Sequence, residues 1–173
     1  MKSFKFTSFF QVLFIGIIIV WGFNKPVHGY WIDEESDNKS EVQRVCNVLL
    51  EPLQPGSATS SILEINCGNK SNLPVFKVNT TYHLASFFDK VNFDSVLIQY
   101  YGSSMCSSNV SYGVGQVSSS VDNRISSGSG FSGCNNIYVY DLANYAGDSA
   151  SCFANCSSFG SLNDRVSSWK ITN

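Results

Sequence analysis

The sequence predicts an all-β fold, and three observations support this prediction. Apolar or alternating runs of four to six residues recur along the chain, separated by clusters of Gly, Ser, Asn and Pro, at 45–50, 62–65, 75–78, 96–101 and 137–140. After the first 29 residues, no stretch keeps a helical period of apolar positions for three turns with caps at both ends. A six-residue pattern also occurs twice, which indicates two copies of one structural unit. Short strands at such spacing favour a sandwich or a barrel.

The N-terminus is typical of a secretory signal peptide. Lys2 and Lys5 precede an apolar run over 9–23, and small residues then follow where a signal peptidase would cut. We therefore expect a signal peptide over 1–29 and a mature chain that starts near Tyr30. A membrane anchor is the alternative, since a span of about 20 residues could include this run, although its uninterrupted part is short for a bilayer.

Removal of the signal peptide changes the charge of the protein. The whole chain has 11 basic and 13 acidic side chains and a net charge of −2. The first 29 residues hold three of the basic side chains and none of the acidic ones, so the remaining 144 carry 8 against 13, a net charge of −5. Such a surface disfavours nucleic acid as a partner. We expect an extracellular protein with no membrane span after processing.

Six cysteines in a secreted chain are expected to form three disulfides. Cys46 and Cys67 stand apart from the other four, so we expect them to pair with each other. The pairing among the remaining cysteines stays open at this point: Cys106, Cys134, Cys152 and Cys156. Secretion also makes five Asn-x-Ser/Thr sites available for glycosylation, at Asn38, Asn69, Asn79, Asn109 and Asn155.

The mature chain divides into three parts. Residues 30–41 contain five acids and indicate a flexible, solvated lead-in. Residues 42–95 are expected to form a β-rich extension stapled by a disulfide. Its aromatic residues are expected to be core rather than a ligand site: Tyr82, Phe87, Phe88 and Phe93. Residues 96–173 contain the repeat and divide into halves at 96–134 and 135–173.

The repeat joins two turns of similar sequence. Asp122-Asn-Arg-Ile-Ser-Ser recurs 41 residues later as Asn163-Asp-Arg-Val-Ser-Ser. A second marker accompanies the later copy, because Tyr140, Tyr145 and Gly147 form the pattern aromatic, four residues, aromatic, one residue, glycine. In the earlier copy the corresponding positions are assigned to Tyr101, Cys106 and Ser108. Only the closing turn of that copy is therefore intact.

These residues resemble the βγ-crystallin family, in which each Greek-key motif opens with the aromatic hairpin and closes with the turn that ends in Ser-Ser. The resemblance covers about half of the mature chain and is most specific in its second half, over 135–173. It implies an all-β Greek-key β-sandwich of two packed sheets, formed by the keys 96–134 and 135–173. The disulfide-stapled extension would precede this domain.

In family members that keep the closing turn, this turn binds calcium, and the residues present here suit that ion. Calcium takes six to eight oxygen ligands at flexible geometry. The resemblance implies a ligand set, with each ion bridging the two keys: the side chains of Asn123 and Asp164, the carbonyls of Arg124 and Arg165, the hydroxyls of Ser126 and Ser167, and the Asp148 carboxylate as an additional donor.

Some positions of the two turns differ, which predicts sites of unequal strength. Asn123 is neutral where Asp164 is charged, so we expect one tight and one weak site. The first residues of the turns, Asp122 and Asn163, are expected to brace them by accepting backbone N–H groups. The alternative is that both turns only fold the chain, as they do in members of the family that bind no calcium.

We expect a secreted calcium-binding structural or adhesion module whose partners are calcium ions and either itself or other extracellular proteins. An enzyme is not expected. After the signal peptide His83 is the one imidazole, no Gly-x-Ser-x-Gly motif accompanies it, and zinc sites of His and Cys lack ligands once the thiols are oxidised. The alternative is a small secreted effector, a protease inhibitor or killer-type toxin, which would present an exposed apolar or extended loop.

Overall fold

Two packed β-sheets form the described part of the protein. The computed structural model describes residues 43–73, 76 and 81–173, so the signal peptide and the acidic lead-in expected over 1–29 and 30–41 lie outside them. The strands are β1 (Arg44–Leu50), β2 (Ile62–Asn69), β3 (Tyr82–Phe88), β4 (Val96–Gly102), β5 (Tyr112–Val114), β6 (Ser127–Gly130), β7 (Asn136–Tyr140), β8 (Ser149–Phe153), β9 (Asn155–Cys156) and β10 (Ser168–Thr172). Short 3-10 turns connect them: η1 (Lys70–Asn72), η2 (Val91–Phe93), η3 (Ala143–Tyr145) and η4 (Gly160–Leu162). Within the described ranges, no helix is both long and apolar enough to cross a membrane.

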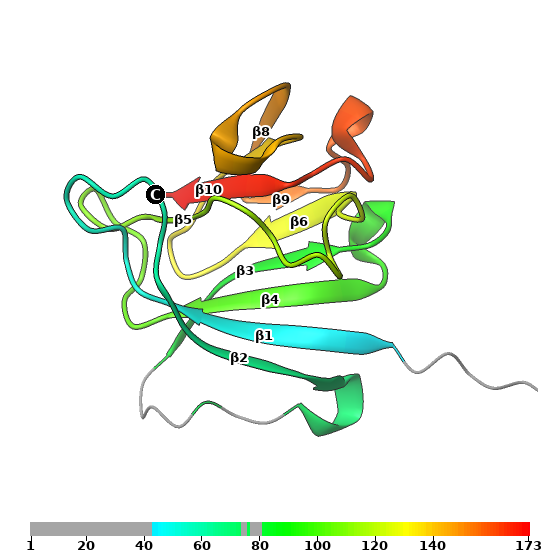
Figure 1. Cartoon of the computed structure of the whole chain (residues 1–173), viewed down its shortest axis with the longest axis horizontal. Helices are drawn as coiled ribbons and strands as arrows, with labels where there is room; N and C mark the ends of the chain where they lie inside the picture. Colours follow the sequence, from blue (N-terminus) through cyan, green and yellow to red (C-terminus); the bar gives the residue numbers. More distant parts are fainter. Residues whose placement is uncertain (1–42, 74–75, 77–80) are drawn as a thin grey trace, which may run out of the picture. The chain divides into compact units, whose positions relative to one another are not determined.

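The sheet topology is that of two Greek keys that exchange a strand. One sheet has the order β2-β1-β4-β3-β6-β9, and the other has the order β5-β10-β7-β8. The first key supplies β3, β4 and β6 to the first sheet, but its third strand, β5, lies in the second sheet. The second key mirrors this, because its third strand, β9, completes the first sheet (Figure 1). The predicted all-β Greek-key sandwich is confirmed.

The N-terminal extension adds the strands β1 and β2 to one edge of the first sheet. β1 runs parallel to β4 and antiparallel to β2, and Cys46 lies opposite Cys67 in the register. A disulfide joins these two cysteines, as predicted. Val48 and Leu50 of β1 belong to the main hydrophobic core, so the extension is packed on the domain. Of the apolar run at 75–78, only Phe76 is among the described residues, and it lies in no strand.

The first key starts earlier than the sequence predicted. β3 pairs with both β4 and β6, so it is the first strand of this key, although it falls within the expected extension 42–95. The expected boundary at residue 96 separates the first strand of the key from its second. The key therefore begins at Tyr82, and the aromatic residues of β3 contribute to it. Phe87 is fully buried as expected, whereas Phe93 is 37% exposed.

The core between the sheets is built around Trp169 of β10. Its side chain is fully buried, with its ring centroid 4.4 Å from that of Tyr100 and 5.4 Å from that of Phe87. Both of those residues belong to the opposite sheet, so the indole contacts strands of both layers. The remaining cysteines pair as Cys106–Cys134 and Cys152–Cys156, and the predicted set of three disulfides without a free thiol is confirmed.

Candidate metal centre

Two equivalent aromatic hairpins open the two keys. Phe88 and Phe93 pack edge to face with centroids 5.8 Å apart, and Tyr140 and Tyr145 do the same at 5.7 Å. The backbone is also equivalent, since Phe93 (φ 64°) and Tyr145 (φ 63°) both adopt the left-handed conformation. The opening hairpin of the first key therefore begins at Phe88, and its assignment to Tyr101 was wrong.

The misplaced hairpin has two physical causes. The hairpins are 52 residues apart in sequence whereas the closing turns are 41 apart, so the first key is 11 residues longer between hairpin and turn. The connection from β4 to β5, which contains Cys106, is correspondingly longer than the one from β8 to β9. In addition, Ser95 (φ 60°) occupies the position of Gly147 (φ 79°), so that a pattern ending in glycine misses it.

The last serine of each closing turn attaches the turn to the hairpin of the same key. Ser127 Oγ donates to the Lys90 carbonyl at 2.6 Å and accepts the Phe93 N–H at 3.1 Å. Ser168 Oγ donates to the Leu142 carbonyl at 2.6 Å and accepts the Tyr145 N–H at 3.0 Å. Both serines are fully buried, so their hydroxyls satisfy backbone groups that would otherwise lack partners.

The two closing turns lie against each other and exchange hydrogen bonds. The Asn123 N–H donates to the Val166 carbonyl at 3.2 Å, and the Asp164 N–H donates to the Ile125 carbonyl at 3.0 Å. Asn123 and Asp164 both have a φ of 57°, in the left-handed region that Asn and Asp tolerate better than most residues. The turns are thus held in one geometry by each other and by their hairpins.

Carboxylate and hydroxyl oxygens form two pairs across this junction. Ser126 Oγ donates to Asp164 Oδ1 at 2.7 Å, and Ser167 Oγ donates to Asp122 Oδ1 at 2.6 Å. Each pair takes one residue from each turn, and both serines are buried. We call these four residues the crossed oxygen pairs. They place a negatively charged oxygen beside a hydroxyl oxygen at two points of the interface between the keys.

In the first turn Asp122, and not Asn123, is hydrogen-bonded to a serine of the second turn. The Asn123 side chain is exposed and makes no hydrogen bond to any described residue. Asn163 braces its turn, because its Oδ1 accepts the Phe159 N–H at 2.9 Å, but Asp122 faces Ser167 instead. The useful signal in the sequence was the acidic residue type, since the acid that reaches the opposite serine is first in one turn and second in the other.

The two arginines of the closing turns form ion pairs through their side chains, whereas their carbonyls are unbonded among the described residues. Neither the Arg124 nor the Arg165 carbonyl accepts a hydrogen bond from the part of the chain that the structure describes. The Arg165 guanidinium lies 2.6 Å from Asp141 and 3.2 Å from Asp148. Asp148, expected as an additional ligand, is thus engaged by Arg165 and is 74% exposed. Arg124 forms the equivalent ion pair with Asp89 at 3.0 Å.

These donors suit a hard cation. Carboxylate, hydroxyl and carbonyl oxygens are the groups that calcium prefers, and the crossed oxygen pairs with the two free carbonyls provide all three. Among the described residues neither Asp122 nor Asp164 takes part in an ion pair, so no side-chain cation there competes with a metal ion for either carboxylate. The described residues contain no group of three or more His, Cys, Asp or Glu side chains that could hold a metal ion.

His83 pairs with a serine that the sequence did not single out. His83 Nε2 lies 2.9 Å from Ser86 Oγ, and the imidazole is stacked between the rings of Tyr101 and Phe131, at centroid distances of 5.0 and 4.1 Å. Burial lowers the pKa of His83. Ser86 is 3% exposed, and no carboxylate among the described residues is hydrogen-bonded to His83. A Ser-His-acid triad therefore has no third member in this part of the chain.

Comparison with known proteins identifies similar solved structures. No protein-family model and no curated protein matches the chain. The N-terminal domain of protein S is 21% identical over 52% of this chain and 96% of its own, with a TM-score of 0.38. A βγ-crystallin from an archaeon is 17% identical over 51% of this chain and 96% of its own, with a TM-score of 0.36. A βγ-crystallin domain from Flavobacterium johnsoniae is 18% identical over 52% and 96%, with a TM-score of 0.35.

The Greek-key assignment rests on the strand pairing of this chain. Both keys open with an aromatic hairpin, close with a turn ending in Ser-Ser, and exchange their third strands. In fold, the chain is similar to the βγ-crystallin domains.

Proposed function

We propose that the protein is a calcium-binding module in which ions bridge the two closing turns. The crossed oxygen pairs support this most directly, because each brings a carboxylate of one key to a hydroxyl of the other at 2.6 to 2.7 Å. A cation that shares such a pair would replace the hydrogen bond between the two oxygens. The carbonyls of Arg124 and Arg165 are the further donors, and water would complete the coordination.

We propose two sites of comparable affinity rather than one tight and one weak site. The expected difference rested on the neutral Asn123, but Asp122 is the residue that faces Ser167. Each crossed pair therefore carries one full negative charge, and ligand charge is a main determinant of calcium affinity.

Isothermal titration of the disulfide-intact protein, after treatment with chelator, should show about two calcium sites with dissociation constants of about 10⁻⁴ to 10⁻³ M. This is the usual range for extracellular modules, because the calcium concentration outside the cell is high. Magnesium is the matched control and should give little heat, because it demands near-ideal octahedral geometry and retains its water. Absence of any calcium-dependent heat would mean that the turns serve only to fold the chain.

We also propose that the protein is secreted. Three disulfides are compatible with an extracellular location, since such bonds persist in oxidising compartments. The acceptor residues Asn69, Asn109 and Asn155 are exposed, as N-linked glycans require. The other two predicted acceptors, Asn38 and Asn79, lie outside the described residues.

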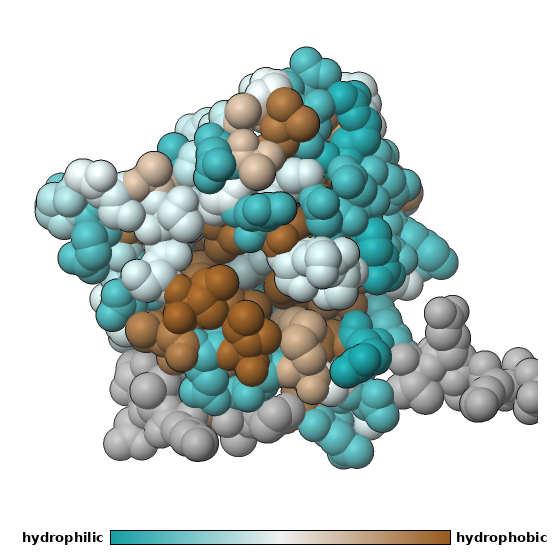
Figure 2. Space-filling view, viewed as in Figure 1, coloured by the Kyte–Doolittle hydropathy of each residue, from teal (hydrophilic) through white to brown (hydrophobic). Residues whose placement is uncertain are grey.

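A structural or adhesive role is the first candidate, and a small effector is the second. The effector is favoured by exposed apolar residues on the outer strand β2, where Ile62, Leu63 and Ile65 are each about half exposed. Figure 2 shows hydrophobic side chains gathered on this face, in the area where β1 and β2 run in Figure 1. Such a surface suits contact with another protein.

Sedimentation velocity with calcium and with chelator separates the two roles. An adhesion module should self-associate when calcium is added and dissociate when it is removed. A protein that remains monomeric under both conditions would contradict self-adhesion and leave the effector as the better candidate.

A further inference from the structure

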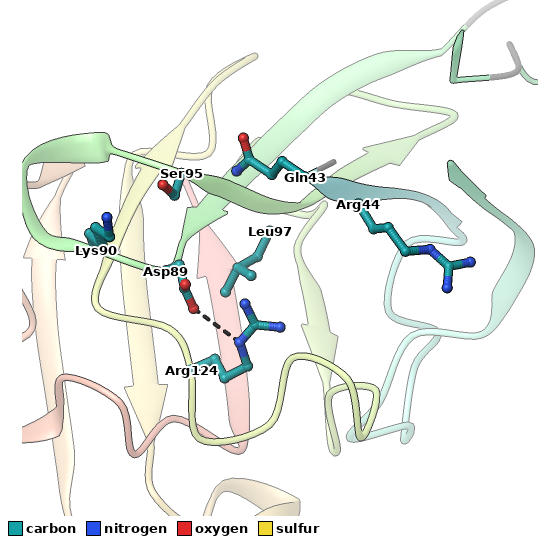
Figure 3. A pocket seen from close by; sticks show the side chains of 7 residues that line it. All are labelled: Gln43, Arg44, Asp89, Lys90, Ser95, Leu97 and Arg124. Carbon is teal, nitrogen blue, oxygen red and sulfur yellow. Dashed lines mark hydrogen bonds and ion pairs between the residues drawn. The ribbon is translucent and has the colours of Figure 1, made fainter. Parts of the chain in front are cut away.

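A groove lies between the N-terminal extension and the first key. One cavity of about 500 Å³ is bounded by β1, by the first aromatic hairpin and by the first closing turn. Its lining consists of Gln43, Arg44, Asp89, Lys90, Ser95, Leu97 and Arg124 (Figure 3). A second cavity of about 240 Å³ shares Arg44, Leu97 and Arg124 with it and extends to the disulfide of the extension. We call the two cavities together the arginine groove.

The arginine groove concentrates positive charge on an otherwise acidic protein. Its larger cavity is lined by three basic side chains, Arg44, Lys90 and Arg124, and by one acidic side chain, Asp89. The residues that the structure describes contain six basic side chains, so half of them line this one cavity. The net charge of the lining is +2, which attracts anions.

Much of the hydrogen-bonding capacity of these cations is unused. Arg44 takes part in no ion pair or side-chain hydrogen bond within the described part of the chain. Arg124 uses Nε for Asp89 and Nη1 for the Ser120 carbonyl, each at 3.0 Å, which leaves Nη2. Lys90 has only an exposed contact with Asp94 at 3.8 Å, and such pairs contribute little. In Figure 3, Arg124 reaches from the closing turn toward Asp89 and Leu97, while Arg44 comes from β1.

The second key shows that this arrangement is not a general result of the fold. There, the equivalent Arg165 is neutralised by two carboxylates, Asp141 and Asp148, and the position of Lys90 is occupied by Leu142. β8, the counterpart of β4, is the edge strand of its sheet, so no strand takes the place of β1. The groove therefore depends on the extension, whose strand β1 lies beside β4 and forms one wall.

We propose that the arginine groove binds a ligand carrying a compact oxyanion, a sulfate, phosphate or carboxylate group, on a polar scaffold such as a sugar. Guanidinium groups match these anions with paired N–H donors. Gln43 Oε1 and the Ser95 hydroxyl offer neutral hydrogen-bonding groups for the scaffold, whereas the Gln43 amide nitrogen donates to the Val96 carbonyl at 2.8 Å. Because the cations are largely solvent-exposed, binding is modest and weakens as salt is added. The groove uses the side chain of Arg124, whereas the proposed calcium site uses its carbonyl, and anion binding does not require calcium.

The test is a titration of the chelator-treated full-length protein at low ionic strength, in which binding is measured by NMR or calorimetry. The probes are inorganic sulfate, inorganic phosphate, acetate, a sulfated disaccharide and its desulfated counterpart. The double variant Arg44→Gln, Lys90→Gln should bind the anionic probes roughly tenfold more weakly, because it removes two charged donors. Lys70→Gln, which removes an exposed charge in η1 outside the groove, is the matched control and should bind as the unaltered protein does.

The outcomes distinguish the source of recognition. Tighter binding of the sulfated disaccharide than of inorganic sulfate would show that the groove also contacts the sugar, whereas equal affinities would assign recognition to the oxyanion alone. Failure of the unaltered protein to bind any anionic probe at 10 mM would overturn the proposal, and so would an equal loss in Lys70→Gln. Melting curves of all variants show whether they are folded, and since neither Arg44 nor Lys90 is buried, no large change is expected.

Discussion

Replacing Asp122 and Asp164 together by alanine will abolish the calcium-dependent rise in the melting temperature of this protein. An ion that bridges two keys binds only the folded domain and stabilises it by mass action. At free calcium about ten times the dissociation constant, each site contributes about 1.4 kcal/mol. For a domain of this size the melting temperature should rise by roughly 2 to 8 °C per site, and Asp164→Ala alone should remove about half of the total effect. Differential scanning calorimetry with calcium and with chelator measures both values.

Asn123→Gly is the control that tests which residue of the first turn is the ligand, Asp122 as the structure suggests or Asn123 as the sequence motif predicts. Glycine accepts the left-handed backbone of Asn123, so this variant removes the side chain without backbone strain. Because the Asn123 side chain is exposed and faces neither serine, the calcium effect should persist. Loss of the effect in Asn123→Gly with retention in Asp122→Ala would show that the motif position, and not the acid, provides the ligand. A melting temperature unchanged by millimolar calcium in the unaltered protein would refute the site altogether.

Trp169→Ala will cause the largest loss of stability among single substitutions in the core. The indole is fully buried and packs on Tyr100 and Phe87 of the opposite sheet, so its removal leaves a cavity between the two layers. We expect a loss of about 3 to 5 kcal/mol in the free energy of unfolding. The melting temperature of the chelator-treated protein should fall by roughly 10 to 20 °C.

Phe153→Ala is the matched control for this core substitution. Phe153 is also an aromatic residue of a strand, but its side chain is 71% exposed. Its truncation should change the free energy of unfolding by no more than about 0.5 kcal/mol. Chemical denaturation of the two variants measures the difference directly. Similar losses in both would mean that Trp169 does not occupy the centre of the core.

The parts of the fold that could be predicted from sequence are those that depend on local residue types. The closing turns require Asn or Asp with a left-handed backbone and serines that bond nearby groups, so their pattern is repeated in both keys. The strands β1, β2, β4 and β7 are continuous apolar or alternating runs, and each lies where its run predicted it. The pairing of Cys46 with Cys67 could be predicted because these two cysteines stand apart from the other four in sequence.

The remaining features depend on contacts that sequence spacing does not reveal. The predicted position of the first hairpin was wrong for two reasons. The first key has an insertion between its second and third strands, and a serine stands in its hairpin where the second hairpin has glycine. Asp122 could not be distinguished from Asn123, because a one-residue difference in the turn decides which side chain reaches Ser167. The arginine groove joins Arg44, Lys90 and Arg124, which are 34 or more residues apart in sequence. The hairpin and closing turn of the first key bring Lys90 and Arg124 together, and the parallel pairing of β1 with β4 adds Arg44.

The exchange of third strands also determines when the protein can acquire its structure during synthesis. The first sheet is completed by β9, and in the second sheet β10 lies between β5 of the first key and β7 of the second. While the chain emerges from the ribosome, the apolar faces of β3, β4 and β6 have no partner layer until these last strands have been made. The N-terminal key cannot fold first as an independent unit, in contrast to the usual order for separate domains. The two keys therefore fold as one cooperative unit, because neither sheet is complete until strands of both keys are present.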